Sequence, residues 1–362
     1  MLDKKQTNID CVNQEYNNLS NRKELNYRSC IYNEYLKNNI LSDYEKYNSY
    51  NNLDYLYLKS EKIVGIIREE GSNGEKEMAA CFYNAGFKVI DITTNDLLNN
   101  PYVIGDLDII AFVGGFTYSD TFGSATGWYN VLKSNTILYQ ELTNFRNNKD
   151  KYALGICNGF QLLTLLGWFN DIETEINTQL TQQQTTQQQT TQLTQQQTTQ
   201  QTTQQTTQQI KFKIKLTQNN SQRFESRFNN IKIYKNNSVF LHNMEDNILG
   251  VWSSHGEGKI CFYDANTDTS LENNNTIMEI IEKYVPFKYI DDNENNTTLY
   301  PYNPNGSYNG FASLSSKDGR ILGMMPHAER TFLKNNWAYI PPNLFNNNSK
   351  YSPWFMMFLN VH

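Results

Sequence analysis

Cysteine is scarce in this sequence, and its few copies stand far apart. The 362 residues contain five cysteines, an odd number without a Cys-x-x-Cys pair. This spacing excludes a disulfide framework and a zinc cage as organising features. No other group of histidine, cysteine and aspartate has the spacing of metal ligands, so we expect a reduced, cytoplasmic protein without a metal site. The five are Cys11, Cys30, Cys81, Cys157 and Cys261.

Long apolar runs and an excess of basic residues are also absent. No stretch reaches the roughly 18 apolar residues of a membrane-spanning helix. The first twenty residues lack the apolar core of a secretory signal. The formal net charge is -6, whereas nucleic-acid-binding surfaces are usually basic. We therefore expect neither a membrane nor a nucleic acid as a partner.

Two segments have a biased composition. Residues 1–60 are rich in Asn, Tyr, Lys and Glu and show weak periodicity, so we expect a largely irregular linker or tail of something larger. Residues 178–209 consist almost entirely of Gln and Thr. Such a tract cannot build a packed core, and we expect a disordered surface insertion in a domain spanning 61–362. A self-associating polar tract is the alternative interpretation.

The rest of the chain predicts an α/β fold. Short apolar strands alternate with helical patterns, which is typical of a parallel sheet covered on both faces. After the Gln/Thr tract, alternating strands at 210–216 and 230–235 indicate a small antiparallel addition, and the chain returns to the main sheet at 319–327. The predicted core strands are 62–69, 88–93, 107–115 and 152–157, with helices at 74–87, 125–135, 137–147 and after Cys157.

Four distinctive stretches fall at the carboxyl ends of predicted strands. They are "EEGSNGE", "GGFTYSD", "CNGFQ" and "PHAER". In open parallel sheets, ligands bind at this edge. The first stretch lacks the Lys-Ser/Thr of a nucleotide-binding P-loop. The convergence of these stretches predicts the place of the site.

Cys157 stands where a buried strand turns into a helix. A helix N-terminus favours the reactive thiolate, and Asn158 and Gly159 permit a tight turn. An inert buried cysteine is the alternative.

A nucleophilic cysteine needs a base, and the sequence has only four histidines. His362 is terminal and His242 has no special setting, which leaves His255 and His327. Glu329 lies two positions after His327, so a carboxylate could orient the imidazole. Together with Cys157, this pair forms a Cys-His-Glu triad hypothesis.

Glycines supply the remaining elements of the predicted site. Gly114 and Gly115 could aim a backbone amide at an oxyanion, with the amide of Asn158 as partner, although they could equally mark an ordinary turn. The loop at His255 in "SHGEG" could hold a substrate or simply connect two strands.

A set of motifs in order resembles a known family. The set strongly resembles the glutaminase domain of phosphoribosylformylglycinamidine synthases of purine biosynthesis, over about residues 62–360 apart from the Gln/Thr tract. Residues 8–27 also resemble the stretch upstream of this domain in the long, single-chain form. The motifs include "REEGSNGEKEMAACFYNAGF", "FVGGFTYSDTFGSATGW", "LGICNGFQLLTLLGW", "WSSHGEGKI" and "GRILGMMPHAER".

The resemblance implies a triad-type, class I glutamine amidotransferase with a flavodoxin-like sheet. It implies that Cys157 is the nucleophile, His327 the general base and Glu329 its orienting partner. Gly115 and Asn158 would form the oxyanion hole. Glutamine would contact Gly114, Phe116, Gln161, Ser254 and His255.

The resemblance also implies partners outside the chain. L-glutamine would be the substrate, and a synthase domain or subunit would hold ATP, Mg²⁺ and the ribonucleotide, with no cofactor in this chain. The chain would then be the C-terminal piece of a fused synthase. A same-fold γ-glutamyl hydrolase and a non-catalytic interaction fragment are the alternatives.

Two positions depart from the family pattern. Phe160 replaces a second cysteine, and Ala328 replaces a second proline. Neither change removes a reacting group, but Phe160 could alter the glutamine pocket and Ala328 could relax the loop that holds His327 and Glu329.

Overall fold

A six-stranded sheet forms the centre of the protein. The computed structural model describes residues 8–29, 60–195, 210–342, 344–345 and 349–362. The strand order is β11-β12-β4-β3-β1-β2, in which only the edge strand β11 is antiparallel. The order of the parallel strands is that of a flavodoxin-like sheet, so the predicted fold class is confirmed. The strands are β1 (Ile63–Arg68), β2 (Lys88–Thr93), β3 (Ile109–Phe112), β4 (Tyr152–Ile156), β11 (Ser313–Ser315) and β12 (Ile321–Met324).

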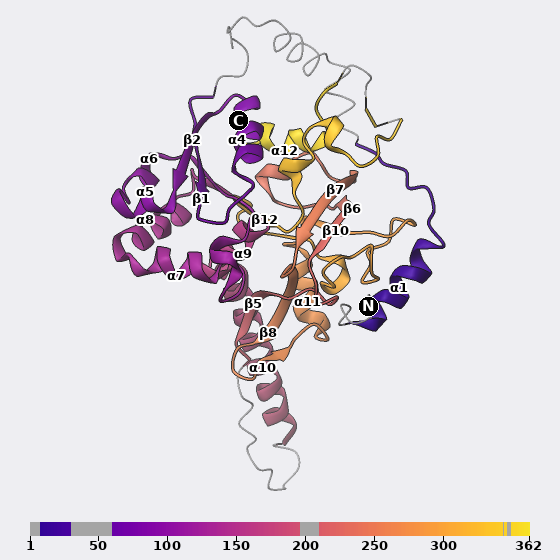
Figure 1. Cartoon of the computed structure of the whole chain (residues 1–362). Helices are drawn as coiled ribbons and strands as arrows, with labels where there is room; N and C mark the ends of the chain where they lie inside the picture. Colours follow the sequence, from indigo (N-terminus) through magenta and orange to yellow (C-terminus); the bar gives the residue numbers. More distant parts are fainter. Residues whose placement is uncertain (1–7, 30–59, 196–209, 343, 346–348) are drawn as a thin grey trace, which may run out of the picture.

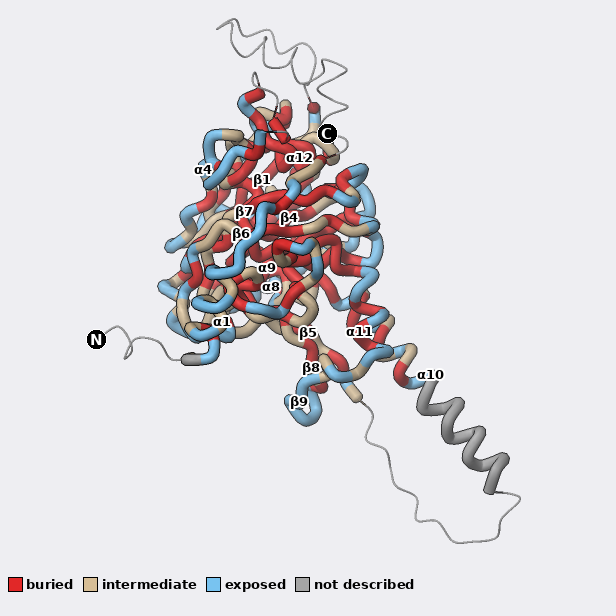
Figure 2. Tube along the Cα trace, turned by 90° about the vertical axis from the view of Figure 1, so that its right-hand side faces the viewer, coloured by how far each residue is buried: buried red, intermediate tan, exposed pale blue. Residues whose placement is uncertain are grey.

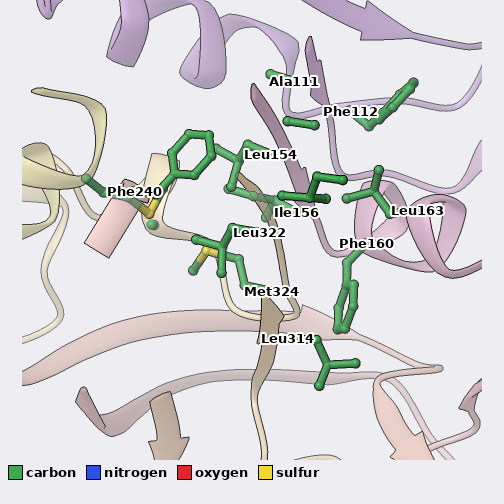
Figure 3. Packing of buried hydrophobic residues seen from close by; sticks show 14 of the residues in the cluster. Ala111, Phe112, Leu154, Ile156, Phe160, Leu163, Phe240, Leu314, Leu322 and Met324 are labelled. Carbon is green, nitrogen blue, oxygen red and sulfur yellow. The ribbon is translucent and has the colours of Figure 1, made fainter. Parts of the chain in front are cut away.

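Helices cover both faces of this sheet. On one face α4 packs against β1 and β2, and its Phe82 meets Phe358 of α12 with ring centroids 5.1 Å apart. On the other face α9 packs against β3, β4 and β12, and α7 packs against α9. Figure 3 shows Phe160 and Leu163 of α9 on one side of the strands and Phe240 on the other. The helices are α4 (Glu75–Asn84), α5 (Thr94–Asn99), α6 (Val103–Asp106), α7 (Thr126–Ser134), α8 (Thr136–Asn147), α9 (Asn158–Leu165) and α12 (Met356–Leu359).

Two antiparallel sheets form the predicted addition beside the central sheet (Figure 1). One has the order β10-β6-β7 and the other β5-β8-β9. The strand predicted at 230–235 begins earlier in the structure, at Glu225. Its first half consists mostly of polar residues, so the sequence contains no apolar signal for that part of the strand. The strands are β5 (Phe212–Thr217), β6 (Glu225–Ile233), β7 (Ile248–His255), β8 (Lys259–Asp264), β9 (Thr269–Ser270) and β10 (Phe287–Tyr289), with helix α11 (Asn275–Glu282) between the last two.

The expectation of an irregular N-terminal segment is wrong for residues 9–19, which form a helix, whereas residues 20–29 have no helix or strand. Helix α1 (Ile9–Leu19) begins at the side-chain cap of Asn8 and lies against the antiparallel part. Asn18 Nδ2 donates to the carbonyl of Tyr300 at 2.6 Å, and an ion pair of 2.7 Å joins Arg28 to Glu294. These contacts are polar and distant in sequence, so hydrophobic periodicity could not predict them. Residues 1–7 and 30–59 lie outside the described part.

The expectation of disorder from residue 178 is wrong for the first half of the tract. Helix α10 (Asn170–Gln195) continues to Gln195, and Figure 2 shows it leaving the body of the molecule. Ile172, Ile176 and Leu180 are buried at a spacing of four residues, so packing establishes the first turns of the helix. Glutamine is a good helix former and lets the helix continue. The rest of the tract, 196–209, lies outside the described part.

Gly159 permits the close packing of α9 on the sheet. A Cβ at this position would lie 2.0 Å from the carbonyl oxygen of Phe112 in β3. Helix α9 begins at the residue after Cys157, so this contact also fixes where the elbow lies.

We expect Gly159→Ala to destabilise the fold. The added methyl would push α9 from β3, which should cost about 1–3 kcal/mol and lower the melting temperature by several degrees. Thermal unfolding followed by circular dichroism measures the change. Gly105→Ala is the control, because a Cβ at Gly105 meets nothing within 4 Å. Equal melting temperatures for the two variants would contradict the prediction.

Candidate active site

Cys157 occupies a strained elbow between β4 and α9. Its backbone has φ 54° and ψ -109°, a conformation that residues other than glycine rarely adopt. Such strain costs on the order of 1–3 kcal/mol and marks functional sites more often than packing sites. The N–H groups of Phe160 and Gln161 donate to the carbonyl of Cys157 at 3.0 and 3.1 Å. The thiol is 5% exposed and donates to the carbonyl of Ser254 in β7 at 3.6 Å.

His327 and Glu329 form a buried pair just after β12. Nδ1 of His327 lies 2.5 Å from Oε1 of Glu329, and neither side chain is more than 1% exposed. The N–H of His327 donates to the carbonyl of Trp252 in β7 at 2.7 Å, and the Thr331 hydroxyl donates to the carbonyl of His327 at 2.6 Å. The contact between the two side chains forms with Ala328 between them in the sequence.

The charge of His327 depends on this pairing. Burial lowers its pKa, but the carboxylate of Glu329 and the nearby Cys157 outweigh burial and raise the pKa of His327 to about 9. Because Nδ1 faces the carboxylate, Nε2 is the free nitrogen, and within the described residues it has no hydrogen-bond partner.

Gly114 brings the nucleophile and the base together. A Cβ at Gly114 would lie 2.8 Å from Cε1 of His327 and 3.4 Å from Cβ of Cys157. The carboxyl ends of β3, β4 and β12 therefore meet at Gly114. The structure brings together all three residues of the predicted triad.

Two backbone amides next to the elbow, those of Gly115 and Asn158, have no backbone acceptor among the described residues. The carbonyl of Gly114 accepts the N–H groups of Asn73 and Gly74 at 3.0 and 3.3 Å, so the N–H of Gly115 points away from that loop. The N–H of Asn158 opens helix α9, where no earlier turn can accept it. Within the described residues, the N–H of Gly115 does not donate to a backbone carbonyl, and the N–H of Asn158 does not either. Such free donors are what an oxyanion requires.

Gln161 links the elbow to the turn after β7. Its Nε2 donates to the carbonyl of Glu257 at 2.5 Å, and its Oε1 accepts from Asn158 Nδ2 at 3.1 Å. The hydroxyl of Thr117 donates to Oδ1 of Asn158 at 2.9 Å. Both ends of the Gln161 amide are thus engaged, which fixes the loops around the site. A direct contact between Gln161 and glutamine stays a prediction.

His255 is the last residue of β7, and its contact with Asn219 determines which ring nitrogen carries the proton. Its Nδ1 lies 3.2 Å from Oδ1 of Asn219, whose Nδ2 donates to the carbonyl of His255 at 2.7 Å. Nδ1 therefore carries the proton. Burial and, less strongly, the charge of His327 lower the pKa of His255 to about 3, so the ring stays neutral. Its Nε2 is buried without a partner among the described residues.

Phe116 and Phe160 lie in different surroundings. Phe116 is 39% exposed and packs against Phe224, with ring centroids 5.6 Å apart. Phe160 is fully buried, and a Cβ at Gly323 of β12 would lie 2.0 Å from its ring. Phe160 therefore fills the core behind α9 and does not line the site.

Some residues of the site carry no signal in the sequence. Asn219 holds His255 from a loop 36 residues away, and Thr117 holds Asn158 across 41 residues. Tyr118, Ser119 and Asp120 form a left-handed turn with φ of 52°, 56° and 53°, although none of them is glycine.

Two negative findings apply to the described residues. No group of three His, Cys, Asp or Glu side chains there could hold a metal ion. In the same part of the chain, no helix is both long and apolar enough to span a membrane.

Sequence comparisons find relatives named phosphoribosylformylglycinamidine synthase. The protein from Dictyostelium discoideum is 37% identical over 304 residues, which is 82% of this chain and 19% of that protein. The human protein is 36% identical over 298 residues, which is 82% of this chain and 20% of that protein. The chain thus spans about a fifth of the length of these relatives.

The structural and family comparisons agree with the geometry. A chain of the structure titled PurLQS from Thermotoga maritima matches with a TM-score of 0.52 and 17% identity, over 83% of this chain and 98% of that one, which supports the fold. Residues 61–362 match the family described as CobB/CobQ-like glutamine amidotransferase domain. The chain therefore belongs to this family of glutamine amidotransferases.

Proposed function

We propose that this domain hydrolyses L-glutamine through a thioester on Cys157 and supplies ammonia to a phosphoribosylformylglycinamidine synthase. The observation that carries the proposal is the meeting of the strained Cys157 and the buried His327–Glu329 pair at Gly114. A cysteine, a base and an orienting carboxylate in this arrangement can perform covalent acyl transfer.

The first half of the reaction forms the thioester. The thiol rotates from the Ser254 carbonyl toward Nε2 of His327, which in its neutral form takes the thiol proton while Glu329 holds Nδ1–H. The thiolate attacks the side-chain amide carbon of glutamine, and the N–H groups of Gly115 and Asn158 stabilise the oxyanion. His327 returns the proton to the amide nitrogen, and ammonia leaves.

The second half regenerates the enzyme. His327 takes a proton from water, whose oxygen attacks the thioester carbon through a second oxyanion at the same amides. The carbon–sulfur bond breaks, the thiol of Cys157 recovers its proton, and glutamate leaves. The sum is glutamine and water to glutamate and ammonia.

The names of the relatives support the identity of the ammonia acceptor. They are named phosphoribosylformylglycinamidine synthase, and this chain aligns with about a fifth of each. We propose that a synthase portion outside this sequence uses the ammonia to convert formylglycinamide ribonucleotide to formylglycinamidine ribonucleotide in purine biosynthesis. That portion would bind ATP and Mg²⁺, and the whole would act in the cytoplasm.

The proposal is tested by following glutamate release from L-glutamine and by intact-mass analysis of the chain during turnover. We expect glutamate and ammonia in equal amounts and a γ-glutamyl adduct on the peptide containing Cys157. Turnover of γ-glutamyl peptides in place of glutamine would instead support a γ-glutamyl hydrolase. The absence of both the adduct and glutamate release would refute the proposal.

We expect Glu329→Gln to shift the pH dependence of glutamine hydrolysis. The carboxylate raises the pKa of His327, so its loss lowers that pKa, and the neutral base then forms at lower pH. The rising limb of the kcat/KM profile should move toward acid by about one to two units. The maximum should fall, because the imidazolium loses its partner. Glu329→Asp, which keeps the charge, is the control, and an unshifted limb in Glu329→Gln would contradict the prediction.

A further inference from the structure

Helix α1 lies outside the matched domain but binds the loop between β5 and β6, beside the candidate active site. The family match begins at residue 61, after the whole of α1. Asn8, at the start of the helix, donates from Nδ2 to the carbonyl of Asn220 in this loop at 2.7 Å. Farther along the helix, Oε1 of Gln14 accepts the N–H of Tyr300 at 3.1 Å. Directional polar contacts thus define where α1 docks on the antiparallel part of the molecule (Figure 1).

The surface that receives α1 has an uncompensated positive charge when the helix is taken away. Arg223 and Arg227 both pair with the buried carboxylate of Glu225, at 3.1 and 2.6 Å. Glu15 of α1 supplies the second carboxylate, which lies 3.4 Å from Arg223 and 2.7 Å from Arg227. The two arginine side chains are only 31% and 23% exposed. Two partly buried guanidinium groups against one carboxylate are unfavourable, so this surface is complementary to α1.

Asn219, in the same loop, holds the turn that follows β7. Its side chain is buried, and its Nδ2 donates to the carbonyls of His255 and Arg223 at 2.7 and 3.1 Å. Its Oδ1 accepts the N–H of Gly258 at 3.0 Å, and its own N–H donates to the carbonyl of Gly256 at 2.9 Å. One buried residue therefore joins the segment that carries Arg223 to the turn after β7.

The end of β7 and the turn after it contact the groups of the elbow. The carbonyl of Ser254 accepts the thiol of Cys157 at 3.6 Å. The carbonyl of Glu257 accepts Nε2 of Gln161 at 2.5 Å. A shift of this turn would move the resting position of the thiol, and a displacement of about 1 Å in a catalytic group can cost about 100-fold in rate.

We infer that helix α1 is a positioning element for glutamine hydrolysis and that Asn219 is the positioning residue that carries its effect to the active site. The inference rests on the proposed function. With α1 docked, Arg223 and Arg227 are neutralised, and Asn219 keeps the turn after β7 in place. With α1 undocked, repulsion between the two arginines loosens the loop, and the turn loses its support. Any part of a larger protein that moves α1 thereby controls the rate of hydrolysis.

The test follows hydrogen–deuterium exchange and glutamate release in the full chain after removal or reversal of the charge of Glu15. In Glu15→Gln, the amides of residues 256–260 should exchange about fivefold faster, and kcat/KM for L-glutamine should fall about 5- to 10-fold. Glu15→Lys should have the larger effect on both, because it repels both arginines. The exchange of β3 should stay parental. Glu24→Gln, at an exposed position of the same N-terminal segment, is the matched control and should change neither value.

A double variant tests the part assigned to Asn219. Asn219→Ala alone should speed exchange at residues 256–260 and lower kcat/KM at least as much as Glu15→Lys. Because both substitutions act on the same turn, adding Glu15→Lys to Asn219→Ala should cause little further loss. If Asn219→Ala does not fold, the two Glu15 variants decide the inference alone, since α1 lies outside the amidotransferase domain.

Three results would overturn the inference without touching the proposed function. They are faster exchange confined to residues 9–19, faster exchange of the turn with an unchanged kcat/KM, and losses that multiply in the double variant. The first would mean that Glu15 only holds its own helix in place. Failure of the proposed function differs, because the parent chain would then release no glutamate, whatever the exchange of the turn.

Discussion

Replacing Cys157 by alanine lowers glutamine hydrolysis by at least about 10⁴-fold, because no other group at the elbow can form the thioester. The next cysteine in the site's vicinity is Cys81, which packs under Glu329 with Sγ 3.8 Å from its carbonyl oxygen. Burial and the charge of Glu329 raise the pKa of the Cys81 thiol well above its usual value, so it cannot substitute. Initial rates of glutamate release measure the loss.

The fold of the Cys157→Ala variant should survive. The thiol makes one weak hydrogen bond, to the Ser254 carbonyl, and alanine keeps the backbone of the elbow. Cys261→Ala is the matched control, since Cys261 lies in β8 and its sulfur contacts the hydroxyl of Thr217 at 3.2 Å. We expect full activity for the control and an unchanged melting temperature for both variants. If the rate of glutamate release by the Cys157→Ala variant were within tenfold of the parental rate, the thioester mechanism would be refuted.

The central sheet could be predicted because its strands carry their own signal. β1, β3 and β4 are continuous apolar runs, and each precedes a segment with helical spacing. Helix α1 could not be predicted, since it is held by contacts such as Asn18 to Tyr300 across 282 residues. The helical half of the Gln/Thr tract could not be predicted either, because it also depends on contacts outside its own sequence. Its start depends on the packing of Ile172 and Ile176, which lie before the biased composition begins.

The triad could be predicted because each member stands at the end of an apolar strand. Short patterns around Cys157 and His327 then suffice, with Glu329 two positions away. The surroundings of these residues depend on tertiary contacts. Asn219 sets the tautomer of His255 from a distant loop, and Phe160 turns toward Gly323 rather than the pocket. A single sequence does not show which face of α9 meets which strand.

Replacing His327 by asparagine should cost nearly as much activity as replacing Cys157, because nucleophile and base act as one unit. Asparagine suits the test, since its side-chain amide can still donate to Glu329. Alanine would leave that buried carboxylate uncompensated, which typically costs 3–5 kcal/mol of stability. We expect glutamate release to fall about 10³- to 10⁴-fold, with alkylation of Cys157 by iodoacetamide slowed as well.

The double variant Cys157→Ala/His327→Asn decides whether the two residues work together. If His327 acts only by taking the proton of Cys157, its loss has nothing further to remove once the thiol is gone. The double variant should then be no slower than Cys157→Ala alone. His242→Asn, at an exposed position, is the matched control and should retain parental rates. Losses that multiply would instead place His327 in a step independent of the thiol, and the Cys157–His327–Glu329 unit would have to be abandoned.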